Sequence, residues 1–195
     1  MSHHPFTWLS DSGQKRLLVV FVIVTLILAQ GLTVLGEPLK QAASPWGIIS
    51  FEFAGTLSAA QAMVAGWKAE GKEVYAGLNL GLDYLYLVCY TTTIALGCVL
   101  VARQFTSRLP FLTVIGNGLA WAQFGAALLD ASENYALIQV LLGSTQALWP
   151  ALAWWCALPK FIIVLIGLGF IVIGSVGLIL WKLFGNKQAH ILPKL

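Results

Sequence analysis

Charged residues are scarce in this sequence of 195 residues. Asp, Glu, Lys and Arg make up 10% of the chain, against about 25% in a typical soluble domain, while hydrophobic residues make up 58%. Several long apolar runs separate the few charges, and this pattern places the protein in a lipid bilayer. No run of Lys and Arg is interleaved with aromatic residues, so the sequence predicts no nucleic-acid-binding surface.

Histidine is also missing from the apolar part of the chain. The three histidines all lie in the two tails: His3, His4 and His190. Their absence from the apolar segments excludes a histidine-based metal site and a Ser/His/Asp triad inside a bundle. The three cysteines form no Cys-x-x-Cys pair, and no Walker or dinucleotide-binding glycine motif occurs. We therefore predict buried free thiols, no metal and no cofactor.

Four apolar segments are long enough to cross a bilayer as helices, which takes about 20 residues each. The first ends at Pro38, which stops a helix, and a short turn before Pro110 joins the second to the third. The segment 143–159, rich in Trp and Pro, is expected to be a connection at the membrane interface. We predict an all-α membrane protein, a four-transmembrane-helix bundle that forms one domain over residues 1–195. The expected spans are about 17–36, 77–102, 110–142 and 160–184.

Residues 51–67 are typical of a helix but make a poor span. Apolar residues recur every three or four positions from Phe53 to Trp67, and Glu52 and Gln61 interrupt the segment. We expect one additional amphipathic helix over about 51–67, lying on the outer side of the membrane.

The basic residues orient the chain. The segments expected on one side hold seven of the 11 Lys and Arg residues: Lys15, Arg16, Arg103, Arg108, Lys182, Lys187 and Lys194. The other side holds four, and glutamates dilute them further. Because cytoplasmic loops carry the excess of Lys and Arg, both termini and the turn 103–110 are expected in the cytoplasm.

One ionisable residue from each of several spans is expected at a single depth. Asp83 lies 20 residues before Arg103, and Asp130 lies 20 residues after Pro110. At a helical rise of 1.5 Å per residue, both are about 30 Å from the turn, near the far edge of the hydrocarbon core. Lys160 falls at a similar height. This level could simply mark where the helices leave the lipid, because a charge in the core costs about 2.5–3.5 kcal/mol.

Two polar stripes favour a pocket over a simple boundary. Four polar side chains of the second span recur at i, i+4, i+7 and i+11, and those of the third span also share one face. Polar stripes on membrane helices usually face the bundle interior or a wet cavity. The candidate ligand-binding residues are the two stripes with three further charged residues: Glu52, Asn79, Asp83, Tyr86, Tyr90, Gln123, Asp130, Glu133, Asn134 and Lys160.

Short motifs within residues 51–160 resemble uncharacterised bacterial four-span membrane proteins. The chain shares with them Phe-Glu-Phe-Ala at 51–54 followed by Trp67, Leu-Asp-Tyr-Leu-Tyr at 82–86 followed by Tyr90, Leu-Leu-Asp-Ala-Ser-Glu-Asn at 128–134, and Lys160 at the start of the last span. The resemblance implies a multi-pass protein of the bacterial inner membrane and no activity. It draws attention to Glu52, Asp83, Asp130, Glu133, Asn134 and Lys160.

Three functions fit these residues. The favoured one is non-enzymatic: an outer-leaflet, net-acidic pocket that binds a lipid, an amphiphile or a cation, since Asp83, Asp130 and Glu133 outnumber Lys160. The second is a membrane-embedded enzyme whose paired carboxylates do acid/base chemistry on a lipid-like substrate. The third is a structural or assembly subunit, in which Lys160 pairs with Asp130 or Asp83 and only locks the helices.

Membrane lipids are the expected partners, and glycines offer a second. Gly77 and Gly81 form a small-xxx-small pattern in the second span, and the fourth span holds Gly167, Gly174 and Gly177. Such residues let helices approach closely within the bundle, and the same Gly-rich faces could form a homo-oligomer.

Overall fold

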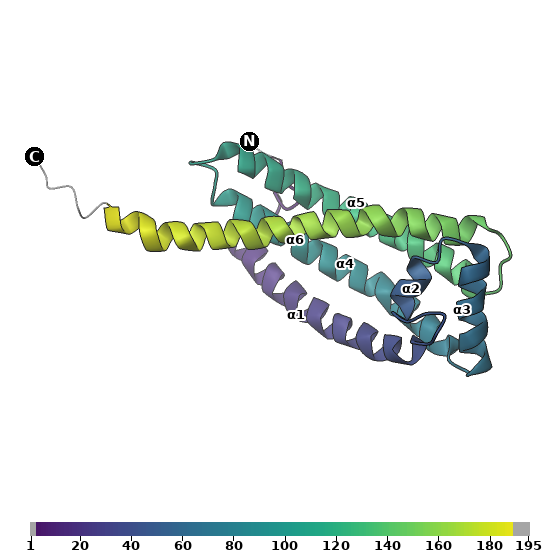
Figure 1. Ribbon diagram of the computed structural model, residues 1–195. Helices are drawn as coiled ribbons and strands as arrows, with labels where there is room; N and C mark the ends of the chain where they lie inside the picture. Colours follow the sequence, from purple (N-terminus) through teal and green to yellow (C-terminus); the bar gives the residue numbers. More distant parts are fainter. Residues whose placement is uncertain (1–2, 189–195) are drawn as a thin grey trace, which may run out of the picture.

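The computed structural model describes residues 3–188, and this part of the chain is built of helices without a β-strand (Figure 1). Four of the helices are long and apolar enough to cross a membrane, namely α1 with its extension η1, α4, α5 and α6. The elements in order are α1 (Asp11–Gly36), η1 (Glu37–Leu39), α2 (Ile48–Glu52), α3 (Leu57–Ala69), α4 (Glu73–Arg103), α5 (Pro110–Leu141) and α6 (Leu148–Gln188).

The helix boundaries follow local sequence signals. The side chains of Ser10 and Thr56 accept hydrogen bonds from backbone N–H groups in the first turns of α1 and α3, which would otherwise be unsatisfied. α5 begins with Pro110, whose fixed φ suits the first helical turn. Gly143 follows α5 with a φ of +96°, a conformation that favours glycine and turns the chain toward α6.

α4 is the central helix of the bundle. It packs against α1, α5 and α6, whereas α1 and α6 flank it without packing on each other. α2 and α3 lie together at one end of the bundle (Figure 1). At the opposite end, Arg103 Nη1 donates to Asp11 Oδ1 over 2.6 Å, and the Arg108 guanidinium lies 4.8 Å from the centroid of the Trp181 ring. The start of α1, the α4–α5 turn and the late part of α6 therefore share one end.

The buried apolar residues form two separate clusters along the bundle. One lies beneath α3 and includes Trp67, Leu80 and Leu137. The other lies nearer the α4–α5 turn and includes Ile94 and Leu96. Asp83 of α4 and the buried Asp130, Glu133 and Asn134 of α5 lie in sequence between the residues of the two clusters, so a polar layer separates them.

Two local predictions from sequence are wrong. The segment 51–67 is not one helix, because α2 ends at Glu52 and α3 begins only at Leu57, with Gly55 between them at a φ of +65°. The connection predicted over 143–159 is shorter, since α6 begins at Leu148 and contains Pro159. α1, α4 and α6 also extend beyond the predicted spans.

Candidate functional site

Lys160 is the centre of the polar layer. It lies on α6 with only 5% of its surface exposed. Its Nζ is 3.0 Å from Oδ1 of Asp130, 2.8 Å from Oε2 of Glu133 and 3.8 Å from Oε2 of Glu52. A buried ammonium group needs such partners, because removing an isolated charge from water is costly. Of the two aspartates named from the sequence as possible partners of Lys160, Asp130 forms the ion pair and Asp83 does not.

Helix geometry and one aromatic stack bring these side chains together. Asp130 and Glu133 are three residues apart on α5 and share its buried face. Glu52 comes from the end of α2, where the ring of Phe53 stacks on that of Phe161 with centroids 5.7 Å apart. Because Phe161 is next to Lys160 in α6, this stack positions Glu52 beside the ammonium group.

Asp130 has both carboxylate oxygens occupied. Its Oδ1 accepts from Lys160, and its Oδ2 accepts a hydrogen bond of 2.7 Å from the hydroxyl of Tyr90 on α4. One carboxylate thus joins α4, α5 and α6 at the same level.

Asp83 is bound differently. Its Oδ2 accepts a 2.6 Å hydrogen bond from Nδ2 of Asn134. Among the side chains that the structure describes, Asp83 forms no ion pair. It lies next to the Lys160 cluster, so four carboxyl groups collect around one ammonium group, and the site is net acidic.

Several carboxyl oxygens lack a hydrogen-bond donor. Neither oxygen of the fully buried Glu133 receives a hydrogen bond, although Oε2 is within ion-pair distance of Lys160, and the buried Oε2 of Glu52 receives none either. Burial raises the pKa of Glu52, the Lys160 ammonium opposes this, and the Asp130 carboxylate adds to it. The net effect is that Glu52 keeps its proton to a higher pH than an exposed glutamate.

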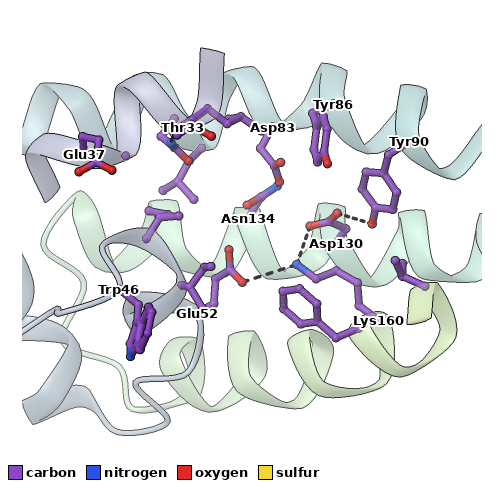
Figure 2. Close-up of a pocket in the computed structure, with 18 of the residues that line it drawn as sticks. Thr33, Glu37, Trp46, Glu52, Asp83, Tyr86, Tyr90, Asp130, Asn134 and Lys160 are labelled. Atoms are coloured by element: carbon purple, nitrogen blue, oxygen red, sulfur yellow. Dashed lines mark hydrogen bonds and ion pairs between the residues drawn. The ribbon is translucent and has the colours of Figure 1, made fainter. Parts of the chain in front are cut away.

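These groups line a pocket of about 340 Å³ (Figure 2). α1 and α6 contribute opposite walls, α4 and α5 the floor, and α2 with the loop before it covers one end. α1 and α6 both contribute to the lining and are not among the helix pairs of the described chain that pack extensively on each other. The lining is Leu32, Thr33, Gly36, Glu37, Lys40, Trp46, Ile48, Ile49, Glu52, Asn79, Leu80, Asp83, Tyr86, Tyr90, Asp130, Asn134, Lys160, Phe161 and Val164.

Most residues that the sequence singled out lie in this pocket, with two exceptions. Glu133 lies behind the wall, in contact with Lys160. Gln123 is buried elsewhere, where its Nε2 donates to the carbonyl of Ile163 over 3.2 Å. The pocket lining includes eight of the candidates: Glu52, Asn79, Asp83, Tyr86, Tyr90, Asp130, Asn134 and Lys160.

The sequence reasoning missed the contributions of α1 and of the loop before α2. Leu32 and Thr33 face the pocket from a helix that reads as uniformly apolar, so no polar stripe marks their face. Trp46 belongs to a loop without periodicity, and only its neighbours Pro45 and Gly47 signal a turn there.

The arrangement can bind a group that carries positive charge or donates hydrogen bonds. Within residues 3–188, no group of three or more His, Cys, Asp or Glu side chains is placed to hold a metal ion. Comparisons of the chain with models of protein families, with curated proteins and with solved structures found no match.

Proposed function

We propose that this chain is an integral protein of the inner membrane whose pocket binds a lipid-like amphiphile. The outward faces of the long helices support the membrane placement. Ile27 of α1 is 65% exposed and Ile173 of α6 is 75% exposed, and both belong to helices whose apolar surfaces are almost entirely unburied by protein. Such surfaces are stable in lipid and not in water.

The observation that carries the binding function is the combination of polar and apolar walls in one pocket. Lys160 and its carboxylates form a polar group at one wall, while Leu32, Ile49 and Val164 provide apolar surface nearby. A mostly apolar cavity with a few convergent polar groups is the usual form of a small-molecule site. An amphiphile matches both parts, its head at the charged residues and its tail along the apolar wall.

The test is whether a molecule occupies the pocket of the purified protein. The protein is extracted from cell membranes in a mild detergent, and bound molecules are identified by native mass spectrometry. Val164→Trp fills the pocket without touching a charge and should abolish the bound species. Leu165→Trp is the matched control, because Leu165 is the next residue of α6 and is 65% exposed, so it should retain the bound species. The proposal fails if Val164→Trp folds and retains it too.

A second candidate, an acid/base enzyme acting on a lipid-like substrate, is favoured by one observation. The carboxyl groups of Glu52 and Glu133 lie beside each other and hold oxygens without hydrogen-bond donors. Two neighbouring buried acids have different pKa values, so one can donate a proton while the other accepts one. Conversion of a bound lipid by the wild type, lost in Glu133→Gln with binding retained, would identify the enzyme; binding without conversion would identify a binding protein.

A further inference from the structure

One carboxylate that lines the pocket forms no ion pair with Lys160. Asp130, Glu133 and Glu52 surround the Lys160 ammonium group, whereas Asp83 receives only the amide of Asn134. Asp83 is half-buried and lines the pocket, so a ligand can reach it. An ionised carboxylate in such a place is costly unless a cation compensates it.

Two aromatic rings that line the pocket follow Asp83 on the same face of α4. Tyr86 and Tyr90 follow it on α4, one and two turns along the same face, with ring centroids 5.0 Å apart (Figure 2). The hydroxyl of Tyr90 is committed to Asp130, which fixes its ring. Ring faces attract cations, and an ammonium group near an aromatic face gains further when it is desolvated. The pocket already shows this contact, since Nζ of Lys160 lies 4.7 Å from the centroid of Phe161.

The opposite side of the site offers no second positive charge to a ligand. Among the described side chains, Glu133 is fully buried with neither oxygen hydrogen-bonded, and the buried Oε2 of Glu52 also has no hydrogen-bond donor. The ammonium group of Lys160 is already paired with Asp130, Glu133 and Glu52, so none of it is left for an anionic head. A head that is cationic or donates hydrogen bonds suits this lining better than an anion.

The open side of the pocket selects an amphiphile over a free ion. The pocket occupies the gap between α1 and α6, and its lining there includes the apolar Leu32 and Val164. In the proposed membrane orientation this gap faces acyl chains, so a ligand reaches the pocket from the bilayer and leaves its tail there.

We propose that the pocket takes an amphiphile whose head is an ammonium group, held by the Asp83 carboxylate and the rings of Tyr86 and Tyr90. The proposal rests on the proposed function. It adds that the ligand's head is positively charged, and it names the residues that bind this head. Asn134 orients the Asp83 carboxylate, and Lys160 pairs with the three other carboxyl groups and not with Asp83.

The experiment compares three probes of equal alkyl chain length, with a trimethylammonium, a hydroxyl or a sulfate head. The full chain is placed in nanodiscs of uncharged lipid, and binding is measured with a radiolabelled ammonium probe and by competition with the others. We expect the ammonium probe to bind best and the sulfate probe worst. Asp83→Asn keeps the shape of the side chain and should weaken ammonium binding by about tenfold to hundredfold, while the hydroxyl probe is unaffected.

Two further variants make the result decisive. Glu70→Gln, an exposed carboxylate outside the pocket, should leave all three affinities unchanged. Tyr86→Leu removes a ring without removing charge and should lower the preference for ammonium over hydroxyl even if Asp83→Asn does not fold. Equal binding of the three heads, blocked by Val164→Trp, would overturn this inference and leave the proposed function standing. If no probe binds the wild type, both fall.

Discussion

The Lys160 ammonium group is buried among Asp130, Glu133 and Glu52, so its removal leaves carboxyl groups in the interior without a counter-charge. Breaking a buried pair in this way costs about 3–5 kcal/mol. We expect Lys160→Met to lower the free energy of unfolding by that amount, measured by denaturation in detergent. Lys40→Met removes an exposed pair with Glu37 and should cost about 1 kcal/mol or less.

A double variant separates the ion pair from simple packing. Asp130→Asn combined with Lys160→Met removes both charges of the closest hydrogen-bonded pair, so part of the stability lost in Lys160→Met should return. If Lys160→Met is as stable as the wild type, the cluster does not hold the helices together, and the structural alternative for this protein is excluded.

Glu52 gives a pH dependence whose sign follows from its surroundings. Burial is the largest influence on its pKa and raises it above the ordinary value of 4.5, so the folded state binds this proton more tightly than the unfolded state. The resulting stability is complete below pH 4.5 and is lost as the pH rises through the folded value. We expect the thermal midpoint to fall less steeply as the pH rises above 4.5 in Glu52→Gln than in the wild type. Glu70→Gln should keep the wild-type slope, and an unchanged slope in Glu52→Gln would contradict the assignment.

Residue spacing explains which parts of the site the sequence could predict. Asp83 and Asp130 were placed at one level by counting from a shared turn, and Asn134, one helical turn beyond Asp130, bonds to Asp83. Gln123 lies on the stripe of Asp130 but seven residues away, about 10 Å along the helix, which takes it out of the pocket. Trp46 could not be predicted, because loop residues reach a site through tertiary packing and not through a periodic pattern.

The crossing of helices depends on particular glycines. A Cβ added at Gly116 of α5 would lie 2.6 Å from Cβ of Ala102 and 2.7 Å from the ring of Phe170, whereas one at Gly118 would have no neighbour within 4 Å. We expect Gly116→Ala to destabilise the protein by about 1–3 kcal/mol through overpacking. Gly118→Ala on the same helix should stabilise it by about 0.5–1 kcal/mol, because alanine favours helices. Equal effects of the two changes on the free energy of unfolding would contradict the observed packing.

The glycines noted in the sequence fall into two groups, those packed against another helix and those without a neighbour. Gly167 and Gly174 of α6 lie against α4 and α5, and an added Cβ at either would approach a side chain to within 2.6 Å. Gly81 and Gly177 have no neighbour within 4 Å, so their surfaces remain for lipid or for a second copy of the chain. Composition alone predicts that glycines permit close approach, but only the helix rotation in the structure decides which ones meet a neighbour.

The ends of the helices were predicted less well than the helices themselves, because tertiary contacts decide where a helix ends. Residues 51–67 carry a continuous apolar period, yet Gly55 adopts a φ of +65° and divides α2 from α3. The prolines at 150 and 159 suggested an irregular connection, but Pro150 lies in the first turn of α6, where its missing N–H is not needed. Pro159 is accommodated inside the helix, next to Lys160. Tertiary contacts outweigh local preferences at such positions.

At the scale of the whole molecule, the distribution of basic residues predicts one orientation of the helices in a membrane. The start of α1 and the α4–α5 turn meet at one end through Asp11 and Arg103, and α2 and α3 lie at the other (Figure 1). The basic residues concentrate at the first of these ends, which the positive-inside rule assigns to the cytoplasm. The turn 103–110 is therefore expected inside the cell and the connector after α3 outside.

Cysteine labelling of intact cells tests this orientation directly. The native Cys89, Cys98 and Cys156 are buried and should not react with a membrane-impermeant maleimide. Ala69→Cys, at the end of α3, should be labelled on intact cells, whereas Ser107→Cys, in the α4–α5 turn, should be labelled only after the membrane is permeabilised; both positions are exposed. The reverse labelling pattern would mean that the protein has the opposite orientation, with the pocket near the cytoplasmic leaflet. Labelling of both positions on intact cells would show that α4 does not cross the membrane, because the two cysteines flank that helix.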